Sequence, residues 1–141
     1  MKKLIPLFVP FLISGCVTLD SMIGQKTVDD NLVGIWNGEY DKQDGSHVEW
    51  TQVRNGDGRY LTFFKVRKSS GDTSESVESG NWWVEDRLFH EINPKWAKQP
   101  FAYKYTFYNA DCLKFEQSGR AETANENGLY SFTECKKRAN P

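Results

Sequence analysis

The chain has 141 residues, of which 38% are hydrophobic, 26% charged and 14% aromatic, and it contains three cysteines and two histidines. This length fits one small domain, and the composition excludes a disordered chain, a disulfide-scaffold miniprotein and a two-domain enzyme. The formal net charge of -1 lacks the basic excess of nucleic-acid-binding proteins, so we expect no nucleic-acid partner.

The first residues are typical of an export signal. Lys2 and Lys3 give a positively charged start, residues 4–13 form an uncharged apolar run, and two small residues follow. The run is about half the roughly 20 residues that a membrane-spanning helix needs. We therefore expect a signal peptide over residues 1–15 and no transmembrane anchor.

The end of this signal carries a more specific motif. Ile13-Ser14-Gly15-Cys16 resembles the lipobox of bacterial lipoproteins. The resemblance implies that Cys16 is acylated and becomes the first residue of the mature protein. Val17, where inner-membrane lipoproteins carry aspartate, implies an outer-membrane location in a Gram-negative cell, with the domain facing the periplasm. The alternative is an ordinary secretory signal with a coincidental cysteine.

The mature chain divides into a spacer and a folded domain. Residues 17–30 show no sustained apolar period of either kind, which is typical of a linker. We therefore expect residues 16–31 to be the lipidated N-terminus and a tether, and residues 32–138 to form the domain.

From Leu32 onward, apolar and polar residues alternate, and Gly, Asn, Asp and Ser interrupt the pattern every eight to twelve residues. This pattern predicts an all-β domain. Because the turns are short, we expect an antiparallel up-and-down meander of about eight strands that closes as a small barrel. The expected strands are 33–40, 47–54, 59–67, 76–85, 88–92, 101–108, 112–118 and 129–136.

Aromatic residues mark the inward face of one strand. Phe101, Tyr103, Tyr105 and Phe107 alternate with smaller or polar residues, so this face should point into the barrel. Tyr103 and Tyr105 are therefore candidate cavity-lining residues. The alternative is that side chains fill so narrow a barrel.

The two remaining cysteines predict a disulfide. In an oxidising envelope compartment Cys112 and Cys135 should pair. If they face each other on antiparallel strands, Phe115 lies opposite Phe132 on the inner face, below a polar outer face that carries the bond. Residues 119–128 then form a long loop. An additional strand within this loop would place the cysteines about 9–10 Å apart, which is too far for a bond.

The first expected strand carries a second family motif. Gly34-Ile35-Trp36 resembles the Gly-x-Trp motif of lipocalins and related calycin barrels. The resemblance implies a calycin-like barrel with Trp36 closing its floor, a late arginine, for which Arg138 is the positional candidate, packed over the tryptophan, and a small hydrophobic molecule inside. The alternative is that Trp36 is an ordinary core residue.

Three further tryptophans are candidates for ligand or partner binding. Trp82 and Trp83 are adjacent, so in a strand they point to opposite faces, and the outer one is either covered by the tether or exposed. Trp96 lies in a loop between Pro94 and Pro100. It suits a cavity lid, a protein contact or a lipid-headgroup contact. The alternative is that it folds back and plugs the barrel.

The sequence offers little for catalysis. His47 and Glu49 share a strand face and His90 adjoins Glu91, but no third metal ligand is apparent beside either pair. Motifs for a nucleophile elbow, a phosphate-binding loop and a redox Cys pair are missing. We therefore expect no enzyme activity, no metal and no cofactor.

Three functions remain open. The first is a non-catalytic, lipid-anchored envelope barrel that binds a small hydrophobic ligand, and an empty aromatic-lined cavity above roughly 300 Å³ would favour it. The second is a periplasmic protein inhibitor or immunity factor, which a filled core with a protruding Trp96 or 119–128 loop would favour. The third is a structural role in envelope assembly.

Overall fold

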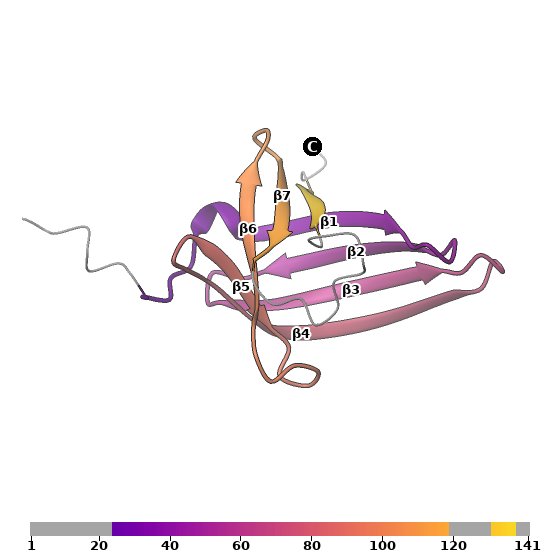
Figure 1. Ribbon diagram of the computed structural model, residues 1–141, viewed down its shortest axis with the longest axis horizontal. Helices are drawn as coiled ribbons and strands as arrows, with labels where there is room; N and C mark the ends of the chain where they lie inside the picture. Colours follow the sequence, from indigo (N-terminus) through magenta and orange to yellow (C-terminus); the bar gives the residue numbers. More distant parts are fainter. Residues whose placement is uncertain (1–23, 119–130, 138–141) are drawn as a thin grey trace, which may run out of the picture.

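The computed structural model describes residues 24–118 and 131–137. In this part of the chain, eight antiparallel strands in chain order form one closed barrel (Figure 1), which confirms the predicted fold class. The strands are β1 (Gly34–Asp41), β2 (His47–Arg54), β3 (Arg59–Arg67), β4 (Thr73–Glu85), β5 (Leu88–Ile92), β6 (Phe101–Phe107), β7 (Cys112–Gln117) and β8 (Ser131–Lys136). A short 3-10 helix, η2 (Asp30–Leu32), precedes β1.

The strands have the predicted bounds in β2, β3 and β5; β1 is shifted by one residue at both ends, β4, β6 and β7 differ at one end, and the predicted start of β8 at residue 129 lies outside the described residues. β4 begins at Thr73, before the predicted residue 76, because it pairs with β3 over nine residue pairs, from Arg59 opposite Asn81 to Arg67 opposite Thr73. In the described part of the chain, no helical segment could span a bilayer.

The barrel is asymmetric. Strands β1–β4 are long and extend beyond β5–β7 (Figure 1). The closure between β1 and β8 is short, with only three residue pairs, from Trp36 opposite Lys136 to Gly38 opposite Glu134. Because neighbouring strands run in opposite directions, the loops after odd-numbered strands lie at one end, called here the open end. The turns after even-numbered strands and η2 lie at the other, the closed end.

The closed end holds the apolar core. Trp36 is fully buried, and its indole N–H donates to the carbonyl oxygen of Leu32 at 2.8 Å, which ties β1 to η2. Each large apolar side chain buried here stabilises the fold by about 1.5–3 kcal/mol. The core residues are Leu32, Trp36, Tyr60, Trp82, Phe89, Tyr103, Leu113 and Phe115.

The arginine expected over Trp36, Arg138, falls outside the described residues. Another basic side chain, that of Lys136, lies over the Trp36 ring. The ammonium of Lys136 is 5.4 Å from the centroid of the Trp36 ring. A cation at this distance attracts the π face of the indole. Residue 136 of β8 therefore supplies a late basic partner for this tryptophan.

The segment before β1 is docked on the barrel. Thr27 forms an antiparallel bridge with Val84, and the ammonium of Lys26 lies 4.2 Å from the centroid of the Trp83 ring. Trp83 is thus covered by the tether segment, while its neighbour Trp82 is buried in the core. Of the two arrangements left open by the sequence, the covered one is present.

Asp29 continues this attachment at the closed end. Its carboxylate accepts a hydrogen bond from the Asn31 backbone N–H and caps η2. It also accepts from the Tyr105 hydroxyl at 3.0 Å. Burial and the nearby Asp29 carboxylate raise the pKa of Tyr105 to about 12, so this phenol stays a donor at neutral pH.

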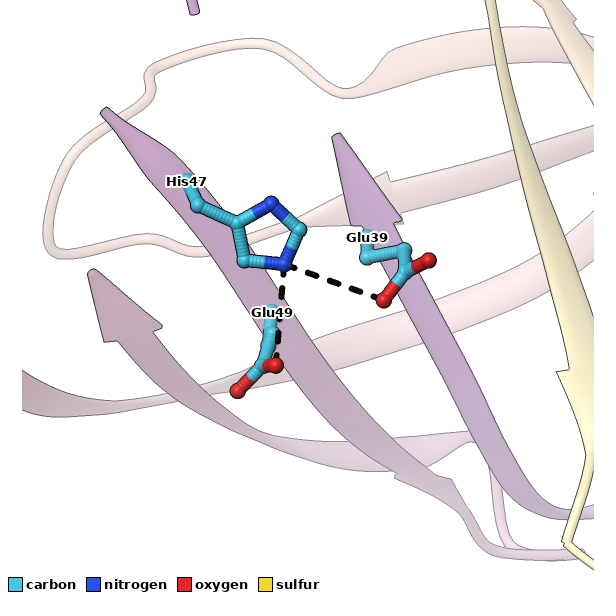
Figure 2. A group of neighbouring side chains, drawn as sticks. All are labelled: Glu39, His47 and Glu49. Carbon is cyan, nitrogen blue, oxygen red and sulfur yellow. Dashed lines mark ion pairs between the residues drawn. The ribbon is translucent and has the colours of Figure 1, made fainter. Parts of the chain in front are cut away.

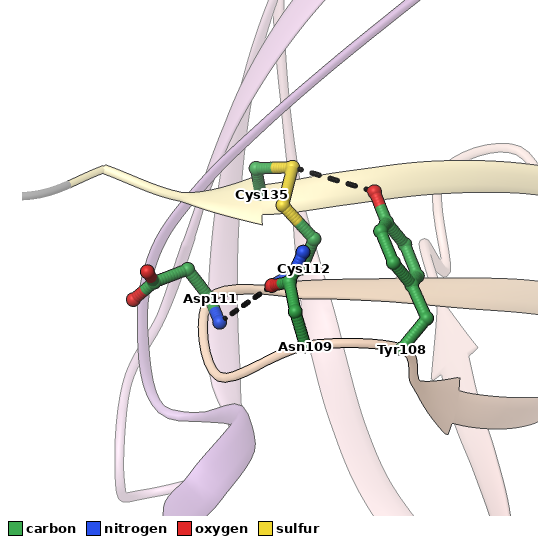
Figure 3. Close-up of a disulfide and its surroundings, with 5 residues drawn as sticks. All are labelled: Tyr108, Asn109, Asp111, Cys112 and Cys135. Atoms are coloured by element: carbon green, nitrogen blue, oxygen red, sulfur yellow. Dashed lines mark hydrogen bonds between the residues drawn. A yellow bond between two sulfur atoms is a disulfide. The ribbon is translucent and has the colours of Figure 1, made fainter.

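The predicted disulfide is present. Cys112 and Cys135 are bonded and face each other on β7 and β8, and Phe115 lies opposite Phe132 as expected. Figure 3 shows Asn109 beside the bond, accepting hydrogen bonds from two backbone N–H groups, those of Asp111 and Cys112. The bond covalently ties β8, the strand that closes the barrel, to β7. The 119–128 loop lies outside the described residues.

The aromatic row on β6 is inward only at its centre. Tyr103 is buried and Tyr105 half-buried, but Phe101 and Phe107 are 44% and 38% exposed. The prediction of an aromatic inner face is therefore wrong at both strand ends. β5 pairs with β6 only from residue 101 to 103, and β7 pairs with it only from residue 103 to 107, so each end of β6 has a paired strand on one side only.

Candidate ligand-binding cavity

The interior near the open end contains a cavity of about 240 Å³. Its aromatic lining consists of Tyr40, Trp50, Phe64, Tyr103 and Phe132. Its polar lining consists of Gln52, Thr62, Glu91 and Glu134. The volume is below the roughly 300 Å³ that was expected of a ligand-binding barrel, so that criterion is not met, and the space suits a small ligand only.

A glycine gives Trp50 its position in this wall. Gly38 lies between Trp50 on β2 and Glu134 on β8 in the strand register. A Cβ at residue 38 would overlap the indole ring of Trp50. Without it, the ring crosses β1, and its N–H donates to the Glu134 carboxylate at 2.8 Å. The indole thus forms the cavity wall and orients the buried carboxylate.

An ion pair separates the cavity from the apolar core. Arg54 donates to the other Glu134 oxygen, and both side chains are 1% exposed. The Arg54 guanidinium lies 4.8 Å from the ring centroid of Phe89 and 5.1 Å from that of Phe115. Arg54 does not line the cavity. The Arg54 charge therefore interacts with Glu134 and with the aromatic rings of the closed end.

The second polar group of the cavity centres on Gln52. Its amide N–H₂ donates to the Thr62 hydroxyl at 3.1 Å and to the Glu91 carboxylate at 3.2 Å. Gln52 is 6% exposed, yet its Oε1 has no hydrogen-bond partner in the described residues. An unpaired acceptor of this kind is uncommon in folded proteins.

Of the two carboxylates that line the cavity, Glu91 forms no ion pair with a basic side chain of the described residues, whereas Glu134 pairs with Arg54. Burial raises its pKa to about 6, and the negative charges of Glu134 and Glu78 act in the same direction. The charge of Arg54 and the Gln52 hydrogen bond lower the pKa but do not offset the burial. At neutral pH Glu91 is mostly ionised, so the cavity carries an uncompensated negative charge.

A second group of ionisable side chains lies on the outer face. Figure 2 shows His47 Nε2 pointing between the carboxylates of Glu39 and Glu49, at 3.7 and 3.6 Å. The sequence alone suggested no third group beside His47 and Glu49, but the β1–β2 register places Glu39 opposite Glu49. Among the described residues, this is the one cluster with the composition of a metal site.

The hydrogen bonding of His47 favours an imidazolium there. Its Nδ1 lies 2.7 Å from the Asp41 carboxylate. That hydrogen bond, followed by the charges of Asp41, Glu39 and Glu49, raises the pKa of His47. A protonated ring offers no lone pair to a metal ion. The raised pKa of His47 therefore opposes metal binding by this cluster, because a metal ion would compete with a proton for the ring.

The tryptophans and tyrosines singled out from the sequence separate into distinct environments. Trp36 and Trp82 are core residues of the closed end, and Trp83 is covered by Lys26. Tyr103 lines the cavity, whereas Tyr105 bonds Asp29 at the closed end instead. The structure therefore places only one of these candidates in the cavity.

Trp96 is 69% exposed, so the alternative that it plugs the barrel is wrong. It follows a turn in which the Asn93 side chain accepts from the Lys95 backbone N–H. The Lys95 ammonium lies 4.9 Å from the centroid of the indole ring. This tryptophan is available at the surface of the β5–β6 loop.

The polar residues of the cavity were missed because polar residues in a half-buried strand are expected to face outward. Two signals could have found them. On β2, Val48, Trp50, Gln52 and Arg54 alternate and therefore share one face. The cysteine pairing also places Glu134 opposite Leu113, and hence inside the barrel.

Comparisons of the chain with protein-family models, with curated proteins and with solved structures find no match.

Proposed function

We propose that this protein is a non-catalytic, lipid-anchored protein of the bacterial envelope whose barrel binds a small molecule in the open-end cavity. The Gly34-x-Trp36 motif on the first strand and the closed barrel support a calycin-like role. The division of the interior supports it further, because an apolar closed end provides a rigid floor for a cavity at the other end.

The observation that carries this proposal is the unpaired polar lining of the cavity. Leaving a buried acceptor such as Gln52 Oε1 unpaired costs about 1–3 kcal/mol. Placing the ionised Glu91 beside it adds to that cost. A bound molecule that donates hydrogen bonds would offset both costs, whereas a filled apolar interior would never have incurred them.

Native mass spectrometry of the protein purified from its own envelope tests the binding function. We expect a mass above that of the acylated chain by one small molecule, which is released on unfolding. The matched control is a Thr62→Trp variant, whose larger side chain would fill the cavity. The same added mass on this variant, or none on the wild type, would contradict binding in the cavity.

The membrane anchor is tested separately, at Cys16, which lies outside the described residues. Cys16→Ala removes the only thiol of the lipobox motif, so we expect the variant to leave the membrane fraction. Several acyl chains give durable anchoring because each buried methylene contributes about 0.8 kcal/mol. An unchanged membrane fraction, or an N-terminal peptide without acyl mass, would contradict the anchor.

A second function is favoured by the exposure of Trp96. A tryptophan on a surface loop beside Lys95 and Lys98 resembles the aromatic anchors that dominate protein interfaces. This supports a periplasmic inhibitor that blocks an enzyme such as a lysozyme. Inhibition of lysozyme that is lost in Trp96→Ala but kept in Trp83→Phe would support this function, and no inhibition by the wild type would exclude that target.

A further inference from the structure

We propose that the open-end cavity selects a small organic ammonium ion, whose N–H groups bond Gln52 and Glu91 and whose apolar part packs against the aromatic walls. This inference rests on the proposed function, because it names the chemical class of the ligand that the same cavity would take. It replaces the purely hydrophobic ligand that the sequence resemblance implies.

The charge of the lining is the first argument. Two of the lining side chains are carboxylates, Glu91 and Glu134, and none in the described residues is basic. Arg54 neutralises Glu134 from the closed-end side. Within the part of the chain that the structure describes, the hydrogen-bond donor to Glu91 is the Gln52 amide. A ligand entering the cavity therefore meets a net negative charge at low dielectric, which favours a cation and opposes an anion.

The hydrogen-bonding groups give the second argument. The unpaired acceptor, Gln52 Oε1, belongs to a side chain that lines the cavity. The other unpaired buried atoms of the described residues, Nε and Nη1 of Arg54 and Nδ1 of His90, belong to side chains that do not line it. The cavity thus offers acceptors and needs donors. A primary or secondary ammonium supplies them, whereas a carboxylate or a neutral hydrocarbon does not.

The aromatic walls give the third argument. Trp50, Tyr103 and Phe132 surround the carboxylates, with Trp50 and Phe132 in edge contact at 5.8 Å and Tyr103 and Phe132 at 5.4 Å. Aromatic faces attract organic cations, most strongly where water is excluded. The same rings accept the apolar part of the molecule. The volume of about 240 Å³ limits that part to one ring or a short chain.

The protonation of Glu91 should tune this binding. Five groups face its carboxyl: Arg54 and Gln52 from β2, Tyr60 from β3, Glu78 from β4 and Glu134 from β8. Together with burial they place the pKa of Glu91 at about 6. Below that pH the cavity loses its uncompensated charge. Affinity for an ammonium that stays protonated should therefore fall as the pH drops from about 7.5 to about 5.

The test is isothermal titration of the full chain at about pH 7.5 with three molecules of matched shape: benzylammonium, benzyl alcohol and benzoate. We expect benzylammonium to bind at least about ten-fold more tightly than the alcohol, and benzoate to bind least. A shorter set, butylammonium, butan-1-ol and butanoate, repeats the comparison in case the ring is too large. Intrinsic tryptophan fluorescence, to which Trp50 in the cavity wall contributes, gives an independent readout.

Glu91→Gln and Glu75→Gln form the matched pair of variants. Glu75 is exposed on the outer face of β4, so its loss should leave the preference for the ammonium unchanged. Glu91→Gln should remove most of that preference while the barrel stays folded, which near-ultraviolet circular dichroism checks. Loss of preference in both variants would overturn the assignment to Glu91.

The remaining outcomes separate this inference from the proposed function. If an alcohol binds as tightly as its ammonium, or a carboxylate binds more tightly, the cation selectivity is wrong while binding in the cavity stands. If no member of either set binds, the selectivity is also wrong. The native mass spectrum then decides independently whether the cavity holds a ligand of another class.

Discussion

The two halves of the barrel interior are built on opposite principles. At the closed end, aromatic and aliphatic side chains pack against one another, and Phe115 lies 5.1 Å from Phe89 and 4.8 Å from Phe132 between ring centroids. At the open end, the same strands enclose a cavity whose lining includes one unpaired polar atom, Gln52 Oε1. The buried pair of Arg54 and Glu134 lies between them. The first half stabilises the fold, whereas the second half leaves a buried polar atom unpaired, which costs stability and fits the proposed binding function.

Truncating one aromatic residue in each half tests this contrast most directly. Trp36→Ala would leave a large hole in the closed-end core and lose the hydrogen bond to Leu32, so we expect a loss of about 3–5 kcal/mol in the free energy of unfolding. Phe64→Ala should cost only about 1 kcal/mol, because Phe64 is half-buried and already borders an open space. Urea unfolding measures both, and equal losses would contradict the division of the interior.

The boundary between the halves gives a comparable effect. Glu134→Leu would leave the Arg54 charge buried without a partner, and we expect a loss of about 3–5 kcal/mol. Glu116→Leu is the control, because its ion pair with Lys114 is exposed and should be worth at most about 1 kcal/mol. The double variant Arg54→Met/Glu134→Leu should recover most of the loss. Failure to recover would mean that the ion pair itself, and not the unpaired charge, sets the cost.

The disulfide should contribute somewhat less. Cys112→Ser opens a bond between residues 23 positions apart, which in the chain-entropy model is worth about 3 kcal/mol. Thermal unfolding should show a lower midpoint, and Cys135→Ser should give the same midpoint because either variant removes the same bond. An unchanged midpoint in both would show that the bond does not stabilise the closure of β8.

The last substitution, Glu91→Gln, should raise the free energy of unfolding, whereas the substitutions above lower it. The pKa of Glu91 is raised from 4.5 in the unfolded chain to about 6 in the fold, so its ionisation destabilises the barrel. The contribution of Glu91 to stability should fall by about 2 kcal/mol between about pH 4.5 and 6 and stay level above that, which the difference between the wild type and Glu91→Gln isolates from other titrating groups. Glu91→Gln should therefore be more stable than the wild type above pH 6 and equal to it near pH 4.

Glu75→Gln is again the control for that measurement, since Glu75 is exposed. Its difference from the wild type should not change over the same pH range. Equal stability of Glu91→Gln and the wild type at about pH 7.5 would mean that another group compensates Glu91, and the charge argument for the cavity would lose its basis.

The strands could be predicted from the sequence because their signals are local. Alternation and turn residues fix β2, β3 and β5 to the residue, and the two cysteines fix the register of β7 against β8. The cavity could not be predicted in the same way. Arg54 and Glu134 are 80 residues apart and meet only through barrel closure. Whether side chains fill a barrel depends on the barrel radius and on the way in which long strands such as β4 splay outward. No local sequence pattern specifies either property.

The candidate residues show the same limit. Tryptophans and tyrosines stood out because large aromatics often bind ligands, yet Trp36 and Trp82 are structural. Gln52 and Glu91 look like ordinary polar residues in the chain. Only the absence of a partner for Gln52 Oε1 in the described residues distinguishes them, and that depends on the folded surroundings.

The docking of the N-terminal segment fixes how the barrel would stand on a bilayer. The Gly24 backbone N–H donates to Asp86 in the β4–β5 turn, so the chain arrives at the closed end. Only seven residues lie between Cys16 and Gly24, so the eight steps from one to the other reach at most about 29 Å when fully extended. A lipid on Cys16 would hold the floor toward the membrane and aim the mouth into the aqueous space. Solutes would then enter from the water layer, and lipids of the supporting leaflet would have no direct route in.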